Sequence, residues 1–379
     1  MKNYLFLLSI GLLISTALSA SVEKKQETPR EYLENKKILI FNAEENENIS
    51  RHKDKYFSAL VFKEFIESNK NNFKLRQKVQ NYMNNGQLKK DNLKEATIVI
   101  NMGLGWDADN YSQQPYYVKN FIDEIKLLGN DVIFLSRFPY APMEQNIESI
   151  KPQLKHILRN KKVILLSLCK GSPELLVSSL EIIRENPEMK KNILGILNMS
   201  GMMAGTFFST SRFDLELLTS IEFLWDKYIP TKNSFSKYDR RQTVWSLPFM
   251  RKNNVIKLVN SVSDVNLDPI PVINVSGILT SDKISKRDTP LKMFISYNQL
   301  TDLYPNANDG FLDITETRFP SKNFSNQSTL LLESSHLLAD GYFNQTDLMI
   351  KENRIKFYQA LYQTLVDKIN ESNKRDKDL

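Results

Sequence analysis

The sequence contains one cysteine and three histidines among 379 residues. A single cysteine cannot form an internal disulfide, so we expect packing to stabilise the fold. One thiol and three scattered histidines also provide no ligand cluster for a metal, and we expect neither a metal nor a cofactor. Cys169 is therefore either an inert buried thiol or a reactive one.

No large excess of charge of one sign is present. The chain has 51 basic and 44 acidic residues, which are interspersed, and its formal net charge is +7. Such a mildly basic surface is not typical of a protein that binds nucleic acid. We expect no nucleic-acid partner.

The N-terminus has the order of a secretory signal peptide. Lys2 precedes an apolar run from Tyr4 to Ile14, and small residues follow as far as Ala20. The run is shorter than the ~20 residues that a membrane span needs. We therefore expect cleavage near Ser19 or Ala20, no transmembrane anchor in the mature chain, and export to the periplasm or out of the cell.

From Ala96 onward, short apolar runs alternate with amphipathic stretches of helical length. This alternation predicts an α/β fold with a mostly parallel, doubly wound sheet, whose strands are buried on both faces. The expected strands are Ala96–Ile100, Asp131–Leu135, Val163–Leu168, Ile193–Met199, Pro271–Leu279, Lys292–Tyr297 and Ser328–Glu333. A long final helix is expected from about Asp347 to Ile369.

The expected organisation has four parts. An N-terminal extension follows the signal peptide and carries one strand at Ile38–Phe41 and one or two helices. A helical insertion rich in aromatic residues interrupts the core at the place of a lid. The parts are 1–20 (signal peptide), 21–95 (extension), 96–204 with 264–370 (core) and 205–263 (lid-like insertion).

Cys169 stands where the apolar run Val163–Leu168 ends and a helix begins. A strand, a sharp turn and a helix in succession are the geometry of a nucleophile elbow, which lifts one side chain above the sheet. Pro173 fits the first turn of such a helix. Ser167 and Ser172 are rival nucleophiles in the same stretch, and a plain buried thiol at Cys169 is the other alternative.

The stretch Ser167-Leu168-Cys169-Lys170-Gly171-Ser172 resembles the G-x-S-x-G-G lipase box of the α/β-hydrolases, in particular the triacylglycerol-lipase-like members. Cys169 stands at the position of the nucleophilic serine, and Ser167 and Ser172 stand at two of the glycines. The resemblance implies an α/β-hydrolase fold with Cys169 as the nucleophile.

A second segment, from Val99 to Gly105, resembles the strand and the H-G-Φ-G oxyanion loop of the same family. Met102 occupies the position of the histidine. The resemblance implies that two backbone N–H groups, those of Leu104 and Lys170, hold the oxyanion.

The resemblance also implies a base and an acid. His336 follows a late strand, in the family's order of nucleophile, acid and histidine. The other two histidines, His52 and His156, do not. The segment Asn306 to Leu312 resembles the N-D-G-L-V segment that carries the family's acid, which indicates Asp309. Asp302 and Asp313 are the alternatives.

These residues together predict an exported enzyme that cleaves a carboxylic ester or a thioester through an acyl-thioester on Cys169. Its partner would be a small-molecule or lipid ester, since the insertion is apolar. Two other functions remain open, an acyltransferase and a catalytically retired binding or interaction protein. The sequence leaves the oligomeric state open.

Overall fold

The computed structural model describes residues 27–85, 93, 95–103, 116–138, 141–205, 252–281, 306–309, 312–334, 336, 342–343, 346–348 and 350–378. The chain divides into two compact units, Met1–Leu39 and Ile40–Leu379. In the first unit, helix α2 (Pro29–Lys36) begins at Thr28, which forms a capping box with Glu31. Such a box satisfies N–H groups that a helix leaves free in its first turn.

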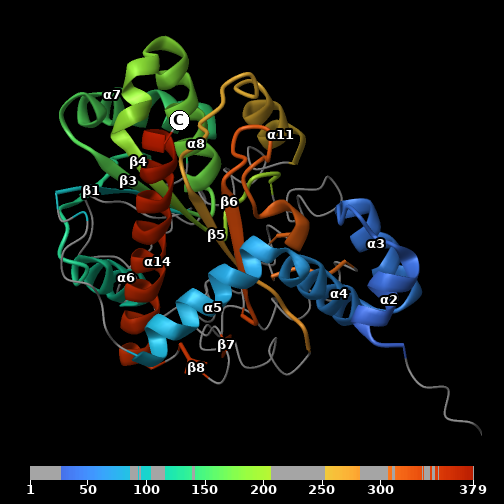
Figure 1. Ribbon diagram of the computed structural model, residues 1–379. Helices are drawn as coiled ribbons and strands as arrows, with labels where there is room; N and C mark the ends of the chain where they lie inside the picture. The colour runs from blue at the N-terminus through green and yellow to red at the C-terminus, as the bar shows by residue number, and fades with distance from the viewer. Residues whose placement is uncertain are drawn as a thin grey trace, which may run out of the picture. The chain divides into compact units, whose positions relative to one another are not determined.

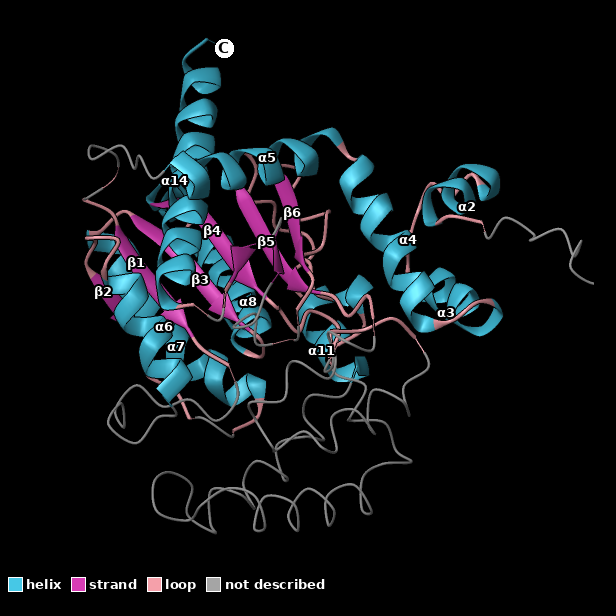
Figure 2. Cartoon of the chain, turned by 90° about the horizontal axis from the view of Figure 1, so that it is seen from below, coloured by secondary structure: helices cyan, strands magenta, loops and turns pink. Residues whose placement is uncertain are grey.

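The second unit is built on a six-stranded sheet in the order β2-β1-β3-β4-β5-β6. Every neighbouring pair in this sheet is parallel. In Figure 2 the strand arrows accordingly run in one direction. The strands are β1 (Thr97–Asn101), β2 (Val132–Phe134), β3 (Val163–Leu168), β4 (Ile193–Met199), β5 (Val272–Gly277) and β6 (Gln327–Leu332). A separate antiparallel pair joins β7 (Tyr342–Phe343) and β8 (Thr346–Asp347).

Each face of the sheet is covered by its own helices. Along β3, Ile164 and Leu166 belong to one buried apolar cluster, whereas Val163 and Leu165 belong to a second. The alternation follows from the two-residue period of a strand, and both faces are apolar because both are buried. The predicted doubly wound parallel sheet is therefore confirmed.

The first cluster is formed with α5 (Lys70–Asn85), α6 (Tyr116–Lys126) and α14 (Lys351–Asp378). The second is formed with α7 (Met143–Asn160), α8 (Gly171–Glu185) and α11 (Lys252–Asn260). Figure 1 shows α14 and α5 crossing in front of the strands, with α8 and α11 behind. Short 3₁₀ helices lie at Pro187–Asn192 and Ile314–Glu316.

The residues that the sequence assigns to an N-terminal extension form helices from Ala43 onward, namely α3 (Ala43–His52), α4 (Lys55–Ser68) and α5. The expected strand at Ile38–Phe41 is absent, so that expectation is wrong. Ile40 is 75% exposed, whereas Phe41 is buried against the rings of Phe62 and Phe65 of α4, so the covered end of the run packs against a helix. The Asn72 side chain of α5 accepts from the Thr329 N–H of β6, the last strand in the sheet order. The N-terminal helices thus shield an edge strand.

Several expectations fall outside the described residues: the signal peptide, the expected strand at Lys292–Tyr297 and most of the lid-like insertion. The expected strands at Val163–Leu168 and Ile193–Met199 coincide with β3 and β4. The final helix is longer than expected, since α14 continues to Asp378. Among the described helices, none combines the length and the apolar character that a membrane crossing requires.

Candidate active site

Cys169 occupies the sharp turn that the sequence predicts between β3 and α8. Its φ of 50° lies in the left-handed region, which residues with a Cβ rarely adopt. The Cys169 N–H donates to the Met199 carbonyl at 3.2 Å, and the Cys169 carbonyl accepts from Ser172 at 3.0 Å and from Met202 at 3.1 Å. The end of β4 and the first turn of α8 therefore hold Cys169 in a conformation that costs of order 1–3 kcal/mol.

Two glycines allow the chain to pack this tightly around Cys169. A Cβ at Gly171 would lie 2.3 Å from the Met102 carbonyl oxygen and 2.4 Å from that of Asn101. A Cβ at Gly103 would lie 3.1 Å from the Cβ of Cys169 and 3.8 Å from its sulfur. The loop after β1 therefore lies directly against the turn that carries the thiol.

The rival nucleophiles are buried. Ser167 and Ser172 are both 0% exposed. Neither hydroxyl has a hydrogen-bond partner within the described part of the chain. Cys169 is partly exposed. Of the three candidates, Cys169 alone presents a side chain that a substrate could reach.

His336 follows β6 and is attached to Asp309 in two ways. Its backbone N–H donates to the Asp309 carbonyl at 2.7 Å, and its Nδ1 lies 2.9 Å from Asp309 Oδ2. The other carboxylate oxygen, Oδ1, accepts from the Leu312 N–H at 2.8 Å. Both side chains are buried. One carboxylate oxygen is held by the Leu312 N–H and the other contacts Nδ1, so Asp309 fixes the orientation of the imidazole ring.

Cys169 interacts electrostatically with the imidazole. Burial on its own lowers the pKa of His336, but the Asp309 carboxylate and the negative charge of Cys169 outweigh it and raise the pKa to about 10. The same attraction between opposite charges favours the thiolate form of Cys169. The structure therefore brings Cys169, His336 and Asp309 together as one connected set.

The alternative acid and histidines serve other purposes. Asp313 caps the 3₁₀ turn at Ile314–Glu316, where Asp313 Oδ1 accepts from the Thr315 N–H at 3.0 Å. His52 and His156 lie exposed on α3 and α7. Asp302 lies outside the described residues.

One of the two expected oxyanion donors is described. Within the described residues, no protein acceptor is found for the N–H of Lys170. Leu104, the other expected donor, lies outside the described residues. Met102, which occupies the family's histidine position, is a core residue that is 6% exposed. Its carbonyl, not its side chain, makes the polar contacts of this segment.

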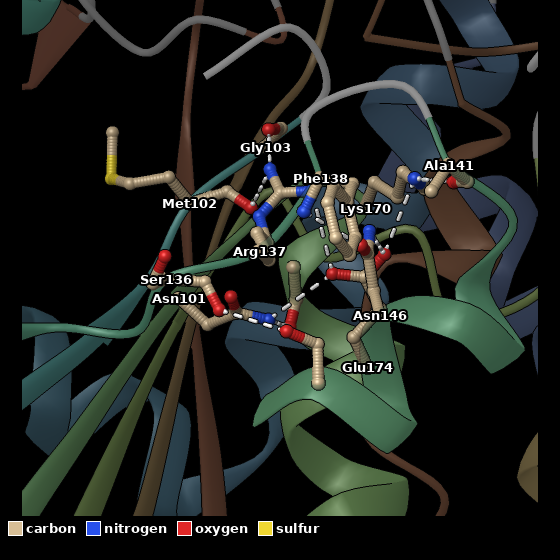
Figure 3. A network of polar contacts seen from close by, with 12 residues as sticks. Asn101, Met102, Gly103, Ser136, Arg137, Phe138, Ala141, Asn146, Lys170 and Glu174 are labelled. Carbon is tan, nitrogen blue, oxygen red and sulfur yellow. Dashed lines mark hydrogen bonds and ion pairs between the residues drawn. The ribbon is translucent and has the colours of Figure 1, made fainter. Parts of the chain in front are cut away.

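A buried polar network behind the turn was not predicted from the sequence. Figure 3 shows it from close by. Glu174 on α8 is 0% exposed and accepts from Asn146 at 2.8 Å and from Asn101 at 3.3 Å. Its two oxygens also lie 3.3 Å from Lys170 Nζ and 3.6 Å from Arg137 Nη1. Two cations and two amides therefore surround one carboxylate.

Burial affects the charge of Lys170 within this network. Its side chain is 0% exposed, and its ammonium group donates to the Ala141 carbonyl. Burial lowers the pKa of Lys170, and the Arg137 guanidinium lowers it further, although the Glu174 carboxylate opposes both. Arg137 stands three residues after the end of β2 and Glu174 in the first turn of α8, but the sequence alone did not show that either is buried. Charged residues at the carboxyl ends of parallel strands are where ligand chemistry gathers.

Within the described ranges, no group of three or more His, Cys, Asp or Glu side chains could hold a metal ion.

Comparison with protein-family models finds no matching family, and comparison with curated protein sequences finds no match. Solved structures that resemble the chain include a metagenomic carboxyl esterase, at 13% identity and a TM-score of 0.42, over 74% of this chain and 76% of that one. Brefeldin A esterase, a bacterial homologue of human hormone-sensitive lipase, matches at 8% identity and a TM-score of 0.37, over 75% and 70% of the two chains. A monoacylglycerol lipase from Paleococcus ferrophilus matches at 12% identity and a TM-score of 0.36, over 72% and 94%.

Likeness at these identities concerns the fold and does not extend to the activity. Six parallel strands lie between two helical layers, and the candidate nucleophile stands in a sharp turn after β3. The fold is a doubly wound α/β fold with a six-stranded parallel sheet, and Cys169 stands at the carboxyl end of β3.

Proposed function

We propose that this protein is an ester hydrolase in which Cys169 is the nucleophile, His336 the proton carrier and Asp309 the residue that orients the histidine. One observation carries the proposal. Cys169 is held at a φ of 50° beside a buried histidine whose far nitrogen is bound to a buried carboxylate. Strained backbone at a reactive side chain is typical of functional sites.

In the first half of the reaction, the Cys169 thiolate attacks the carbonyl carbon of a carboxylic ester or thioester. A carbon–sulfur bond forms, and the carbonyl oxygen becomes an oxyanion that the Lys170 N–H can hold, together with the expected Leu104 N–H. With its pKa raised to about 10, His336 carries a proton at neutral pH. It gives this proton to the departing alkoxide or thiolate as the original bond breaks, which leaves an acyl-thioester on Cys169.

In the second half, neutral His336 takes a proton from water, and the water oxygen attacks the acyl-thioester. The carbon–sulfur bond breaks, the carboxylic acid leaves, and the thiolate and the imidazolium are restored. Asp309 keeps the ring nitrogen that faces Cys169 free for both proton transfers, because it holds Nδ1. If an alcohol replaces the water, the same site acts as an acyltransferase.

The competing function is a binding protein that has lost its activity. Such a protein would have no use for a Cys169 held in a strained conformation, which costs stability, or for an imidazole held in place by a buried carboxylate. The contacts among the three residues therefore favour the enzyme. The substrate class that we propose is a small-molecule or lipid ester, and we propose that the enzyme acts after export, as the N-terminal residues predict.

Hydrolysis of a short-chain p-nitrophenyl ester and of an alkyl thioester tests the proposal. Cys169→Ala should lower the rate by at least about 10³-fold, as expected for loss of a nucleophile. Ser167→Ala is the matched control, because it removes a buried hydroxyl two residues away and should leave the rate unchanged. Equal activity of the wild type and Cys169→Ala would rule out Cys169 as the nucleophile.

A further inference from the structure

Arg137 connects the loop in front of Cys169 with the helix behind it. It follows β2, and its side chain is 2% exposed. One guanidinium nitrogen, Nη2, donates to the carbonyls of both Met102 and Gly103, and the Met102 contact is 2.7 Å long. The other, Nη1, lies 3.6 Å from Glu174 Oε2 on α8. Figure 3 shows Arg137 between the Gly103 backbone and Glu174.

Holding two successive carbonyls with one nitrogen determines the shape of the chain. Successive carbonyls in a strand point to opposite sides, so a nitrogen that binds both holds the chain out of the extended conformation after β1. Gly103 begins the segment that resembles an oxyanion loop and lies against Cys169. Because Gly103 lies against Cys169, a donor that fixes the Gly103 carbonyl also fixes the position of this residue relative to the thiol.

Glu174 gives Arg137 its fixed position. Its carboxylate accepts from two amides, those of Asn101 and Asn146, as well as pairing with Arg137. A buried ion pair is more favourable when its remaining hydrogen-bond positions are filled. The two amides fill positions on the carboxylate, whereas Arg137 Nη1 makes no hydrogen bond within the described residues besides its pairing with Glu174. Asn101 also donates to the Gly171 carbonyl at 2.8 Å, which ties the end of β1 to the start of α8.

We propose that Arg137 is a positioning residue for the oxyanion loop: it fixes the peptide at Gly103 relative to Cys169 through its two carbonyl contacts and its pairing with Glu174. This inference rests on the proposed function. Arg137 does not touch the reacting atoms. It acts on the transition state alone, because the loop is needed where the oxyanion develops and not where the thiol is activated.

Two reactions of the Cys169 thiol distinguish a role in positioning the oxyanion loop from a role in activating the thiol. Alkylation of Cys169 by iodoacetamide is a displacement at a saturated carbon that forms no oxyanion, whereas hydrolysis of p-nitrophenyl butyrate forms one. Arg137→Lys keeps the positive charge but loses the planar fork that contacts both carbonyls and Glu174. We expect kcat to fall by about 10²-fold, as for loss of one oxyanion donor, with KM and the pH profile of alkylation nearly unchanged.

Arg354→Lys provides a matched control. Arg354 of α14 likewise joins a buried carboxylate, Glu124 of α6 at 3.0 Å, to a backbone carbonyl, that of Leu348 at 3.1 Å. Arg354→Lys should lower the stability measured by thermal unfolding about as much as Arg137→Lys does, while its kcat stays at the wild-type value. If Arg137→Lys does not fold, the double variant Arg137→Met with Glu174→Gln removes both charges of the pair together, and the same loss of kcat is expected.

The outcomes are distinct. Unchanged kcat in the Arg137 variants would overturn the positioning role, and so would a parallel loss of alkylation and hydrolysis, since a general collapse of the turn would explain both. A wild type that is alkylated at low pH but hydrolyses no ester would instead refute the proposed function, and the role of Arg137 with it.

Discussion

At the scale of single residues, the reactivity of the protein depends on the pairing of Cys169 with His336. Their opposite charges stabilise each other in a site where the imidazole is buried, and Asp309 holds the far side of the ring. A lone thiol in an apolar site would be inert, because burial disfavours its charged form. On the proposed mechanism, activation therefore requires all three residues, although only Cys169 acts as the nucleophile.

The pH dependence of alkylation tests this pairing. Cys169 should react with iodoacetamide well below the pKa of ~8.5 of a free thiol, because the imidazolium stabilises the thiolate. His336→Gln, which is neutral and of similar size, should move the reaction to higher pH. A wild type that reacts only after unfolding would show that the thiol is not activated.

At the scale of elements, the site depends on the close packing of the end of β1 against the start of α8. Gly171 makes this contact possible, since a Cβ there would meet the backbone of Asn101 and Met102. Gly171→Ala should lower the free energy of unfolding by about 1–3 kcal/mol, the usual range for overpacking, and should also reduce hydrolysis. Chemical denaturation measures the first effect.

Gly195→Ala is the control for this substitution. A Cβ at Gly195 on β4 would meet only the side-chain ends of Ile369 and Leu365, at 3.0 Å, and these can move aside. Gly195→Ala should lower the free energy of unfolding less than Gly171→Ala does, and it should leave hydrolysis intact. A Gly171→Ala variant with wild-type stability would contradict the packing that the structure shows.

Helix α3 also stabilises an element of the site. The Asn46 amide donates to the Ala307 carbonyl at 2.9 Å and to the Asp313 carboxylate at 3.0 Å, and its oxygen accepts from the Ala307 N–H at 3.1 Å. Ala307 stands two residues before Asp309. Asn46→Ala should therefore destabilise the protein by about 1–3 kcal/mol for each buried group that it leaves unpaired.

Thermal unfolding of Asn46→Ala measures this cost, and Asn48→Ala, on the same helix, is its control. A drop in hydrolysis greater than the loss of folded protein would indicate that α3 also orders the loop of the acid. Equal stability of the two variants would mean that the Asn46 contacts contribute nothing.

At the scale of the whole molecule, His336 links stability to pH. Its pKa is raised from 6.5 to about 10 in the folded protein. The contribution of His336 to the free energy of unfolding is therefore fully present below pH 6.5. It is lost as the pH rises through about 10, because the unfolded chain gives up the proton first. The difference in unfolding free energy between wild type and His336→Gln should accordingly be larger at pH 6.5 than above pH 10. A difference that grows with pH would contradict the raised pKa.

The whole fold also shows which features the sequence can reveal. The strands β3 and β4 were predictable because both faces are buried, which makes each strand mostly apolar. Cys169 and His336 were singled out because each follows a strand, and Asp309 because its segment resembles the one that carries the family's acid. Arg137 and Glu174 were not, since buried charges look like surface charges until their partners are known.

One or two helices were expected in the N-terminal extension, but the number and packing of the N-terminal helices were not predictable, for a different reason. Their apolar residues are buried by long-range contacts, such as those that place Leu75 and Val79 of α5 in the same cluster as Leu365 of α14. No local pattern indicates which distant element will cover such a helix. The apolar run Ile38–Phe41, in contrast, had the local pattern of a strand but no neighbouring strand with which to pair.

Mass spectrometry of the acyl-enzyme tests the central claim most directly. The wild type would be mixed with p-nitrophenyl butyrate, quenched in acid during turnover and digested. The account predicts a butyryl mass on the peptide that contains Cys169, removable by hydroxylamine because thioesters are labile to it, and absent from Cys169→Ala. Hydrolysis without that adduct, or an adduct on Ser167 or Ser172 instead, would contradict it.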